Sequence, residues 1–328
     1  MSKRYLVTGG TGFIGSALVR RLLKAGYAVR VLDNNLRGAP RRLEGVLDQI
    51  EMVEADIRDA EAVKQACEGV DAIAHLAYLN GTEFFYSKPE LVLDIAVKGM
   101  VNILEAAIAH NIREFYLASS SETYQTPPSV PTPEQVPLIV PDVMNPRYSY
   151  GGGKIICELM AVNYARKHFD RMIIFRPHNV YGPDMGWEHV LPQFALRMHK
   201  VVEEAGEADT IDFPILGTGE ETRSFVYIDD FTEGLFIAME KGEHNNVYHI
   251  GTMEELSIAE LAQVVGDYFG KQVNIQPGKA PEGSTNRRCP DIAKLRKLGF
   301  DPAISLAEGV AKTAEWYVDN RDKAPNKD

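Results

Sequence analysis

Residues 4–15, RYLVTGGTGFIG, decide the fold of this chain. The segment reads as a short apolar strand, a glycine-rich turn and the start of a helix. A pyrophosphate can reach the backbone amides at such a helix N-terminus only where no Cβ blocks it, which is why glycine is needed. Asp33 ends the next predicted strand, 18 residues after Gly15, close to the spacing of a ribose-binding carboxylate. The segment therefore predicts a dinucleotide site.

The segments that follow alternate between short β-rich runs and amphipathic helical patterns. The predicted strands are 4–8, 28–33, 50–56, 71–78, 114–121 and 171–180, and the predicted helices are 13–25, 60–68, 90–110 and 148–169. Apolar strands that alternate with helices require a parallel sheet covered on both faces. We therefore expect an α/β protein with a Rossmann-type doubly wound parallel sheet and a smaller, mixed C-terminal domain.

Two segments break this alternation. Residues 125–146 contain seven prolines in 22 residues, which predicts an irregular surface excursion. After Gly182 the βα rhythm is lost. We expect a dinucleotide-binding domain over 1–182 (plus part of 225–255) and a mostly substrate-binding domain over 183–328.

The composition excludes several classes of protein. Of the 328 residues, 45% are hydrophobic and 25% charged, which is typical of globular proteins. The net charge of −11 argues against general nucleic-acid binding, which needs excess Lys and Arg. The three cysteines have neither disulfide nor metal-ligand spacing, so we expect no metal site and a reducing cytoplasm. No apolar run approaches the ~18 residues of a membrane span.

The expected cofactor is NAD. Asp33 would accept hydrogen bonds from both adenosine ribose hydroxyls and would repel the 2′-phosphate of NADP, although Arg37 nearby weakens that preference. Asp56 is placed to meet the adenine, but it is also explained as a surface aspartate after a strand. The predicted cofactor-binding residues are Gly9, Gly12, Phe13, Ile14, Gly15, Asp33, Asn34, Asp56, Ile57, Leu76, Ala77, Tyr150 and Lys154.

Tyr150 and Lys154 are candidate catalytic residues. They are four residues apart, so on a helix they share one face. An ammonium beside a phenol lowers its pKa and makes tyrosine a usable general base. The three glycines between them are poor helix formers, each costing ~1 kcal/mol relative to alanine. Close approach of a cofactor or substrate would explain them.

The whole set of motifs resembles the extended short-chain dehydrogenase/reductase family, and more narrowly its NAD-dependent sugar-nucleotide epimerases and dehydratases. The resemblance rests on the TGxxGxxG spacing and spans almost the whole chain. The further motifs are residues 75–77 (HLA), 119–124 (SSSETY), 150–154 (YGGGK), 176–183 (RPHNVYGP) and 217–230 (GTGEETRSFVYIDD).

This resemblance implies a half-reaction at C4 of a nucleotide sugar. Ser120 would hydrogen-bond the C4 hydroxyl that Tyr150 deprotonates while hydride moves to NAD. Returning the hydride to the other face gives 4-epimerisation, our leading expectation. Chemistry at C5 of the 4-keto sugar instead gives 5-epimerisation, 4,6-dehydration or decarboxylation.

Glu122 and His189 bear on that choice. Strand alternation would place Glu122 on the same face as Ser120. Ser120-Ser121-Glu122 resembles the Thr-Ser-Glu pattern of dehydratases and sugar-acid decarboxylases. The stretch around His189 resembles GDP-mannose 3,5-epimerase, which has Cys and Lys where Glu122 and His189 fall. The two residues can form a base and acid pair, or His189 is simply a surface residue.

The resemblance also implies substrate ligands and partners. Arg223 and Arg288 resemble the two arginines that bind the pyrophosphate, and Asn179 and Ser121 would contact the substrate. The apolar helices 90–110 and 148–169 resemble those that form a homodimer in the family, although packing on the sheet also explains them. Remaining alternatives are a dehydrogenase that releases NADH and a catalytically silent NAD-sensing protein.

Overall fold

The computed structural model describes residues 2–279 and 285–324, and its centre is one parallel sheet. The seven strands follow the order β3-β2-β1-β4-β5-β6-β11, so the strand order reverses beside β1. In doubly wound folds, ligands bind at the carboxyl edge of such a switch point. The strands are β1 (Arg4–Thr8), β2 (Ala28–Asp33), β3 (Ile50–Glu54), β4 (Ala72–His75), β5 (Glu114–Ala118), β6 (Arg171–Pro177) and β11 (Asn246–Ile250).

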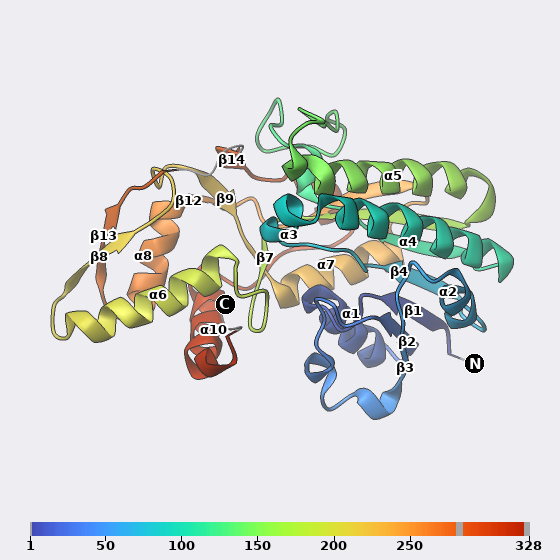
Figure 1. Cartoon of the computed structure of the whole chain (residues 1–328), viewed down its shortest axis with the longest axis horizontal. Helices are drawn as coiled ribbons and strands as arrows, with labels where there is room; N and C mark the ends of the chain where they lie inside the picture. The colour runs from blue at the N-terminus through green and yellow to red at the C-terminus, as the bar shows by residue number, and fades with distance from the viewer. Residues whose placement is uncertain (1, 280–284, 325–328) are drawn as a thin grey trace.

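Helices cover both faces of this sheet, as Figure 1 shows. Helices α1 (Phe13–Lys24) and α7 (Ile228–Lys241) pack on one face. The other face is covered by α2 (Ala60–Ala66), α4 (Pro89–Ala109) and α5 (Ser149–His168), with the short α3 (Thr82–Ser87) beside α4. Side chains of a strand alternate between these faces, so Tyr5 and Val7 join the core below α1 while Leu6 joins the core below α4. The expected fold class is confirmed.

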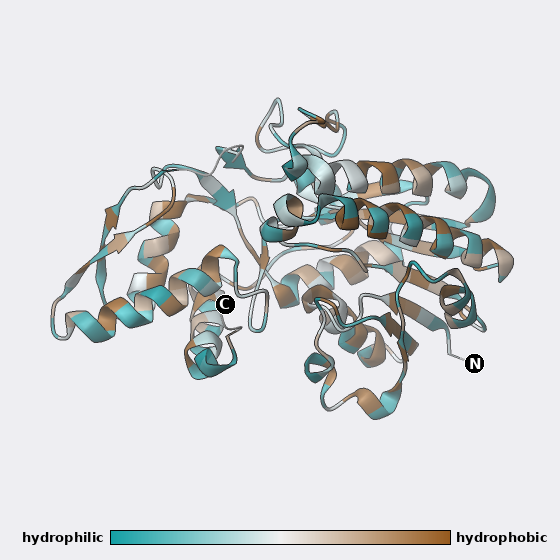
Figure 2. Cartoon of the chain, viewed as in Figure 1, coloured by the Kyte–Doolittle hydropathy of each residue, from teal (hydrophilic) through white to brown (hydrophobic). Residues whose placement is uncertain are grey.

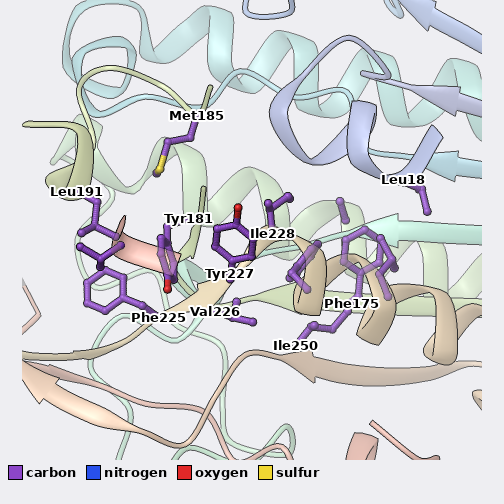
Figure 3. Close-up of a cluster of buried hydrophobic side chains, with 14 of the residues drawn as sticks. Leu18, Phe175, Tyr181, Met185, Leu191, Phe225, Val226, Tyr227, Ile228 and Ile250 are labelled. Atoms are coloured by element: carbon purple, nitrogen blue, oxygen red, sulfur yellow. The ribbon is translucent and has the colours of Figure 1, made fainter. Parts of the chain in front are cut away.

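A second group of elements lies beyond the carboxyl edge of the sheet (Figure 1). The helices there are α6 (Val190–Ala205), α8 (Ile258–Tyr268), α9 (Ala293–Arg296) and α10 (Leu306–Asp319). The strands pair as β8 (Thr210–Pro214) with β13 (Gln272–Gln276), β7 (Val180–Tyr181) with β10 (Val226–Tyr227), and β12 (Glu255–Ser257) with β9 (Thr222–Ser224) and β14 (Arg287–Arg288). Figure 3 shows one continuous core from Phe175 and Ile250 in the sheet to Phe225 and Leu191 in this second group.

The strand ends differ most from the prediction. β5 ends at Ala118, three residues early, because Ser120 caps a 3₁₀ helix, η3 (Ser121–Thr123), by accepting a hydrogen bond from the Glu122 amide at 3.1 Å. The further short 3₁₀ helices are η1 (Pro40–Leu43), η2 (Leu47–Gln49), η4 (Pro146–Tyr148) and η5 (Arg321–Lys323). None of the described helices is long and apolar enough to cross a bilayer.

Candidate active site

The glycine-rich turn leads from β1 into α1 with its backbone exposed to a ligand. Gly9 has a φ of +73°, and a Cβ on it would lie 2.7 Å from the amide nitrogen of Ala77. A Cβ on Gly15 would lie 2.0 Å from the carbonyl oxygen of Gly9, so the helix could not start this close to the turn. Gly12 caps α1 without a side-chain hydrogen bond. The first amides of α1 therefore fit a pyrophosphate.

A pocket opens next to this turn, at the reversal of the strand order. Asp33 lies at its wall, 8% exposed, and accepts hydrogen bonds from the amides of Thr11 at 3.0 Å and Asn35 at 2.9 Å. These bonds fix the carboxylate beside the glycine turn. The predicted residues that line the pocket are Gly9, Gly12, Asp33, Asn34, Asp56, Ile57, Leu76 and Ala77.

The predicted set of cofactor residues lacks some that line this pocket and includes some that do not. The predicted cofactor-binding residues do not include Leu36, Arg37, Gly38, Ala55, Tyr78, Leu79 and Ile95, which also line the pocket, although the sequence had already placed Arg37 near Asp33. Six of these lie within four residues of a predicted one along the chain, so only Ile95 of α4 had no signal. Phe13 instead lines a separate groove between α1 and α7, and Ile14 packs on the core below them.

Asp56 is fixed by its neighbours at the wall of the pocket. Arg58 donates to both carboxylate oxygens at 3.0 and 2.8 Å, and the Asn34 amide donates at 2.9 Å. These hydrogen bonds, above all those from Arg58, lower the pKa of Asp56 to about 2. The carboxylate therefore stays ionised and orients Asn34 toward the pocket wall.

Tyr150 and Lys154 lie buried on α5, beside the carboxyl end of β5. The Lys154 ammonium donates to the carbonyl oxygen of Ala118 at 2.7 Å and lies 5.9 Å from the centroid of the Tyr150 ring. Burial lowers the pKa of Lys154 to about 8. Burial also raises the pKa of Tyr150 to about 12, while a hydrogen bond with Ser120 acts in the lowering direction. The lowered pKa expected for Tyr150 is therefore wrong for the protein alone, because desolvation outweighs the nearby charges.

Tyr78 connects this pair to the cofactor pocket. The Lys154 ammonium lies 3.8 Å from the centroid of the Tyr78 ring, and the rings of Tyr78 and Tyr150 meet edge to face at 5.1 Å. The Tyr78 hydroxyl donates to the backbone carbonyl of Tyr150 at 3.2 Å. Tyr78 follows β4 and lines the pocket, so it lies between this pocket and the residues Tyr150 and Lys154 of α5.

Neighbouring protein groups explain two of the three glycines of α5 without the ligand contact that the sequence suggested. A Cβ on Gly153 would lie 2.2 Å from the Tyr78 hydroxyl, and one on Gly151 would lie 3.0 Å from the Glu122 carbonyl oxygen. A Cβ on Gly152 would meet only Val140, at an ordinary 3.5 Å. Gly151 and Gly153 therefore leave room for neighbouring groups that a side chain would displace, whereas a side chain at Gly152 would meet no clash.

We expect opposite effects from two adjacent substitutions. Gly153→Ala forces Tyr78 away from Lys154 and should cost about 1–3 kcal/mol of unfolding free energy. Gly152→Ala adds a helix-favouring methyl without a clash and should gain up to about 1 kcal/mol. Urea titration of both variants measures these changes, and equal shifts would disprove the steric explanation.

Glu122 lies in a partly buried cluster of arginines, with a quarter of its own side chain exposed. Its Oε1 accepts from Nη1 of Arg288 at 2.6 Å, and Arg147 lies 3.9 Å from Oε2. Burial alone would raise the pKa of Glu122, but Arg288, Arg147 and Arg223 outweigh it and the net pKa is lowered. The alternation argument is wrong, because residues 121–123 form η3 and not a strand. The carboxylate nevertheless affects the pKa of Tyr150, so the two side chains belong to one site.

Arg223 and Arg288 occupy neighbouring positions on β9 and β14. Arg223 donates to the carbonyl oxygens of Thr285 and Thr222, both at 2.7 Å. Burial, followed by the charge of Arg288, lowers the pKa of Arg223 to about 10. Asn179 is near this strand, because its side-chain amide donates to the Ser224 carbonyl at 2.8 Å. Arg147 had no sequence signal of its own.

His189 lies apart from Glu122. It caps α6, and the charged groups that affect it are Glu188 and Arg37, whereas those that affect Glu122 are arginines of other elements. Burial lowers the pKa of His189. Among the described residues no hydrogen bond or ion pair joins His189 to Glu122. The loop before α6 pairs instead with the segment around η1, through Glu188 with Arg37 and Asp184 with Arg41.

The fold and this site define a family. The model of the NAD dependent epimerase/dehydratase family matches residues 5–251, and the chain belongs to that family. It is an enzyme of the group that contains NAD-dependent sugar-nucleotide epimerases, dehydratases and decarboxylases, and its cofactor is NAD. The uncapped start of α1 and the close glycines of the turn fit that cofactor.

Particular relatives show all three activities. The chain is 30% identical to a UDP-N-acetyl-alpha-D-glucosaminuronate decarboxylase of Bacillus cytotoxicus, covering 97% of this chain and 98% of that protein. It is 31% identical to a UDP-glucose 4-epimerase of Mycolicibacterium smegmatis, over 96% and 98%. The dTDP-glucose 4,6-dehydratase structure from Streptomyces venezuelae with NAD bound is 30% identical, with a TM-score of 0.84 over 98% of each chain.

Proposed function

We propose that this enzyme oxidises C4 of a nucleoside-diphosphate sugar and then returns the hydride, so that the net reaction is 4-epimerisation. The observation that carries this proposal is the buried group of Ser120, Tyr150 and Lys154 beyond the end of β5. Tyr78 of the cofactor pocket packs against both Tyr150 and Lys154. A sugar held at this group therefore has its C4 hydroxyl near the base and near the cofactor site.

Each side chain has one task in this reaction. Tyr150 takes the proton of the C4 hydroxyl, and Ser120 hydrogen-bonds the same oxygen. Bound NAD supplies the acceptor of the C4 hydride. With a pKa of about 8, Lys154 is mostly an ammonium at pH 7, and its charge favours the Tyr150 phenolate. Burial raises the pKa of Tyr150 and the hydrogen bond with Ser120 acts against it, so in this proposal Ser120 and Lys154 together assist the proton transfer.

The arginine cluster is the proposed diphosphate site, supplied largely by the C-terminal half of the chain. Arg147, Arg223 and Arg288 carry three positive charges, and the Glu122 carboxylate cancels one of them. The remaining two match the two negative charges of a nucleoside diphosphate, and arginine forms the paired hydrogen bonds that phosphate oxygens accept. A protein with a net charge of −11 can therefore bind an anion where a few cationic side chains are gathered.

Glu122 favours a second candidate function, which is chemistry at C5 of the 4-keto intermediate. The carboxylate is ionised and partly buried, and its charge raises the pKa of Tyr150. A C4-epimerase needs no such group, whereas removal of the C5 proton needs a base. Its ion pair with Arg288 makes it a weaker base, so C5 chemistry remains the second candidate.

Turnover in deuterated water separates the two candidates. The wild-type enzyme is incubated with NAD and UDP-, GDP-, CDP- and dTDP-sugars, and products are followed by mass spectrometry and NMR. We expect an isomer without deuterium. Deuterium at C5, or loss of water or carbon dioxide, would replace the first candidate by the second. Loss of added NAD in proportion to product would instead indicate an ordinary dehydrogenase.

Glu122→Gln is the matched variant for this test. It preserves the shape of the side chain and a hydrogen bond to Arg288, but it cannot act as a base. If Glu122 only binds, the deuterium content of the product is unchanged and KM alone shifts. If Glu122 removes the C5 proton, the variant loses exchange at C5 while oxidation at C4 continues, seen as NADH absorbance.

We also propose that a second copy of the chain covers the outer face of α4 and α5. Figure 2 shows hydrophobic residues along both helices. Leu159 of α5 is 60% exposed, and Leu93, Ile108 and Ile156 are each exposed by more than a third. Sedimentation at micromolar concentration should give a dimer. Leu159→Glu should give a monomer, whereas Leu216→Glu, a change at a 70% exposed leucine outside this face, should not.

A further inference from the structure

A chain of buried polar groups connects the catalytic helix to the strand that carries Arg288. On α5, one turn after Lys154, Glu158 accepts from Arg176 of β6 at 2.8 and 2.5 Å. The Arg176 guanidinium also donates to the hydroxyl of Tyr124, which lies 2.6 Å from Nε2 of His249 on β11.

This series of hydrogen-bonded groups ends at the backbone of Asp291. Nδ1 of His249 lies 3.1 Å from the carbonyl oxygen of Asp291, three residues after Arg288. Glu158, Arg176, Tyr124 and His249 are each at most 5% exposed. No solvent competes for these groups, so every hydrogen bond among them is costly to lose.

Only one arrangement of protons satisfies this chain. A carbonyl oxygen can only accept, so Nδ1 of His249 must donate to Asp291. The imidazole is neutral, because burial and then the charge of Arg176 lower its pKa to about 3. Nε2 therefore accepts from the Tyr124 hydroxyl, whose oxygen accepts from Arg176. Every link has a fixed donor, so one hydrogen-bonding pattern runs from Glu158 to Asp291.

The strand that carries Arg288 needs such an anchor. β14 has two residues, and among the described strands it pairs only with β9. The next residues are held from outside the sheet, where the Thr132 amide donates to the Cys289 carbonyl at 2.9 Å and the Asp291 amide donates to the Thr132 carbonyl at 2.8 Å. Among the described residues, His249 is the only side chain of β11 that forms a hydrogen bond with residues 288–291.

We propose that His249 is a positioning residue, which acts through the Asp291 carbonyl to hold Arg288 at the distance from Tyr150 and Lys154 that a nucleotide sugar requires. This inference rests on the proposed function, because Arg288 is its diphosphate ligand. The His249 ring itself contacts neither substrate nor cofactor. Its effect should therefore appear in the binding of nucleoside diphosphates and not in the binding of NAD.

Two amide variants test the role of each ring nitrogen. In His249→Asn, the side-chain nitrogen stands as many bonds from Cα as Nδ1 does, so the hydrogen bond to Asp291 can be kept. In His249→Gln, the amide reaches the position of Nε2, so it meets Tyr124 but not Asp291. The two variants differ by one methylene and remove the same aromatic ring, so a general loss of packing affects both.

The measurement is calorimetric binding of UDP, GDP, CDP and dTDP to the full chain saturated with NAD. We expect His249→Gln to bind the preferred diphosphate about tenfold more weakly than wild type, from the loss of one buried hydrogen bond, and His249→Asn within about threefold. The dissociation constant of NAD should be unchanged in both. Equal weakening in both variants, or none in His249→Gln, would overturn the inference.

Tyr124→Phe keeps the test decisive if the histidine variants do not fold. It removes the hydroxyl that joins Arg176 to Nε2 of His249, so the ring loses its hydrogen bond on that side and is no longer held in the orientation in which Nδ1 donates to Asp291. Diphosphate binding should again weaken several-fold with NAD binding unchanged, and wild-type affinity would overturn the inference. If wild type binds none of the four diphosphates, the proposed function fails at its first step.

Discussion

Tyr150→Phe should reduce kcat by about 10²- to 10⁴-fold, the range that a positioned general base contributes. The substitution removes one oxygen from a side chain that is 8% exposed, and it leaves the ring against Tyr78 and Phe85. KM and the dissociation constant of NAD should change little, because the lost interaction is with the proton of the reacting hydroxyl. Steady-state kinetics and a separate NAD titration measure the two quantities.

The pH profile adds a second prediction for the same residue. Burial raises the pKa of Tyr150 to about 12, so the phenolate fraction of the free enzyme increases with pH throughout the neutral range. Lys154, with a pKa of about 8, loses its supporting charge above that pH. In wild type, kcat/KM should therefore rise up to about pH 8 and then level off or fall. The residual activity of Tyr150→Phe should lack the rise.

Tyr164→Phe is the matched control. Tyr164 lies on the same helix, beside His168 and away from the site, so it tests the loss of a hydroxyl from α5 without the chemistry. Its kcat should equal that of wild type within about twofold. If Tyr150→Phe retained more than a tenth of wild-type kcat while folding and binding NAD, the assignment of Tyr150 as the base would be wrong, and a silent NAD-sensing protein would become the better interpretation.

The sequence predicted the sheet well because its information is local. Buried parallel strands are continuous apolar runs, so β1 and β2 match their predicted bounds. The seventh strand, β11, was missed for two reasons. It follows β6 only after residues 178–245, and its sequence, NVYHI, begins with a polar residue and contains a buried histidine. Its place in the sheet depends on pairing with β6, a contact between residues about 70 positions apart.

The sequence predicted which residues form the candidate site, but it did not predict which of them touch one another. Motif spacing placed Ser120, Tyr150 and Lys154 near one another. It could not show that Tyr78 lies against Lys154, because that contact joins β4 to α5. Nor could it show that burial would outweigh charge at Tyr150, since desolvation depends on all surrounding elements. The pairing of His189 with Glu122 failed for the same reason, because two residues 67 apart are placed by tertiary structure alone.

Glu158→Gln should destabilise the fold by about 3–5 kcal/mol, the usual cost of removing one partner of a buried ion pair. The Glu158 and Arg176 side chains are 6% and 4% exposed, and their charges meet at 2.5 Å. With glutamine, the Arg176 guanidinium remains buried with its charge uncompensated, and the Ser119 hydroxyl loses a charged acceptor. Urea titration followed by circular dichroism measures the change in unfolding free energy.

An exposed pair of the same chemistry is the control. Arg113 and Asp170 meet at 2.6 Å, close to the separation of the buried pair, but their side chains are 44% and 69% exposed. Asp170→Asn should therefore cost less than about 1 kcal/mol. The double variant Glu158→Leu with Arg176→Met should recover part of the loss, because it leaves no buried unpaired charge. If Glu158→Gln cost no more than Asp170→Asn, burial would not determine the strength of this pair, and its role as the anchor for Tyr124 and His249 would need another explanation.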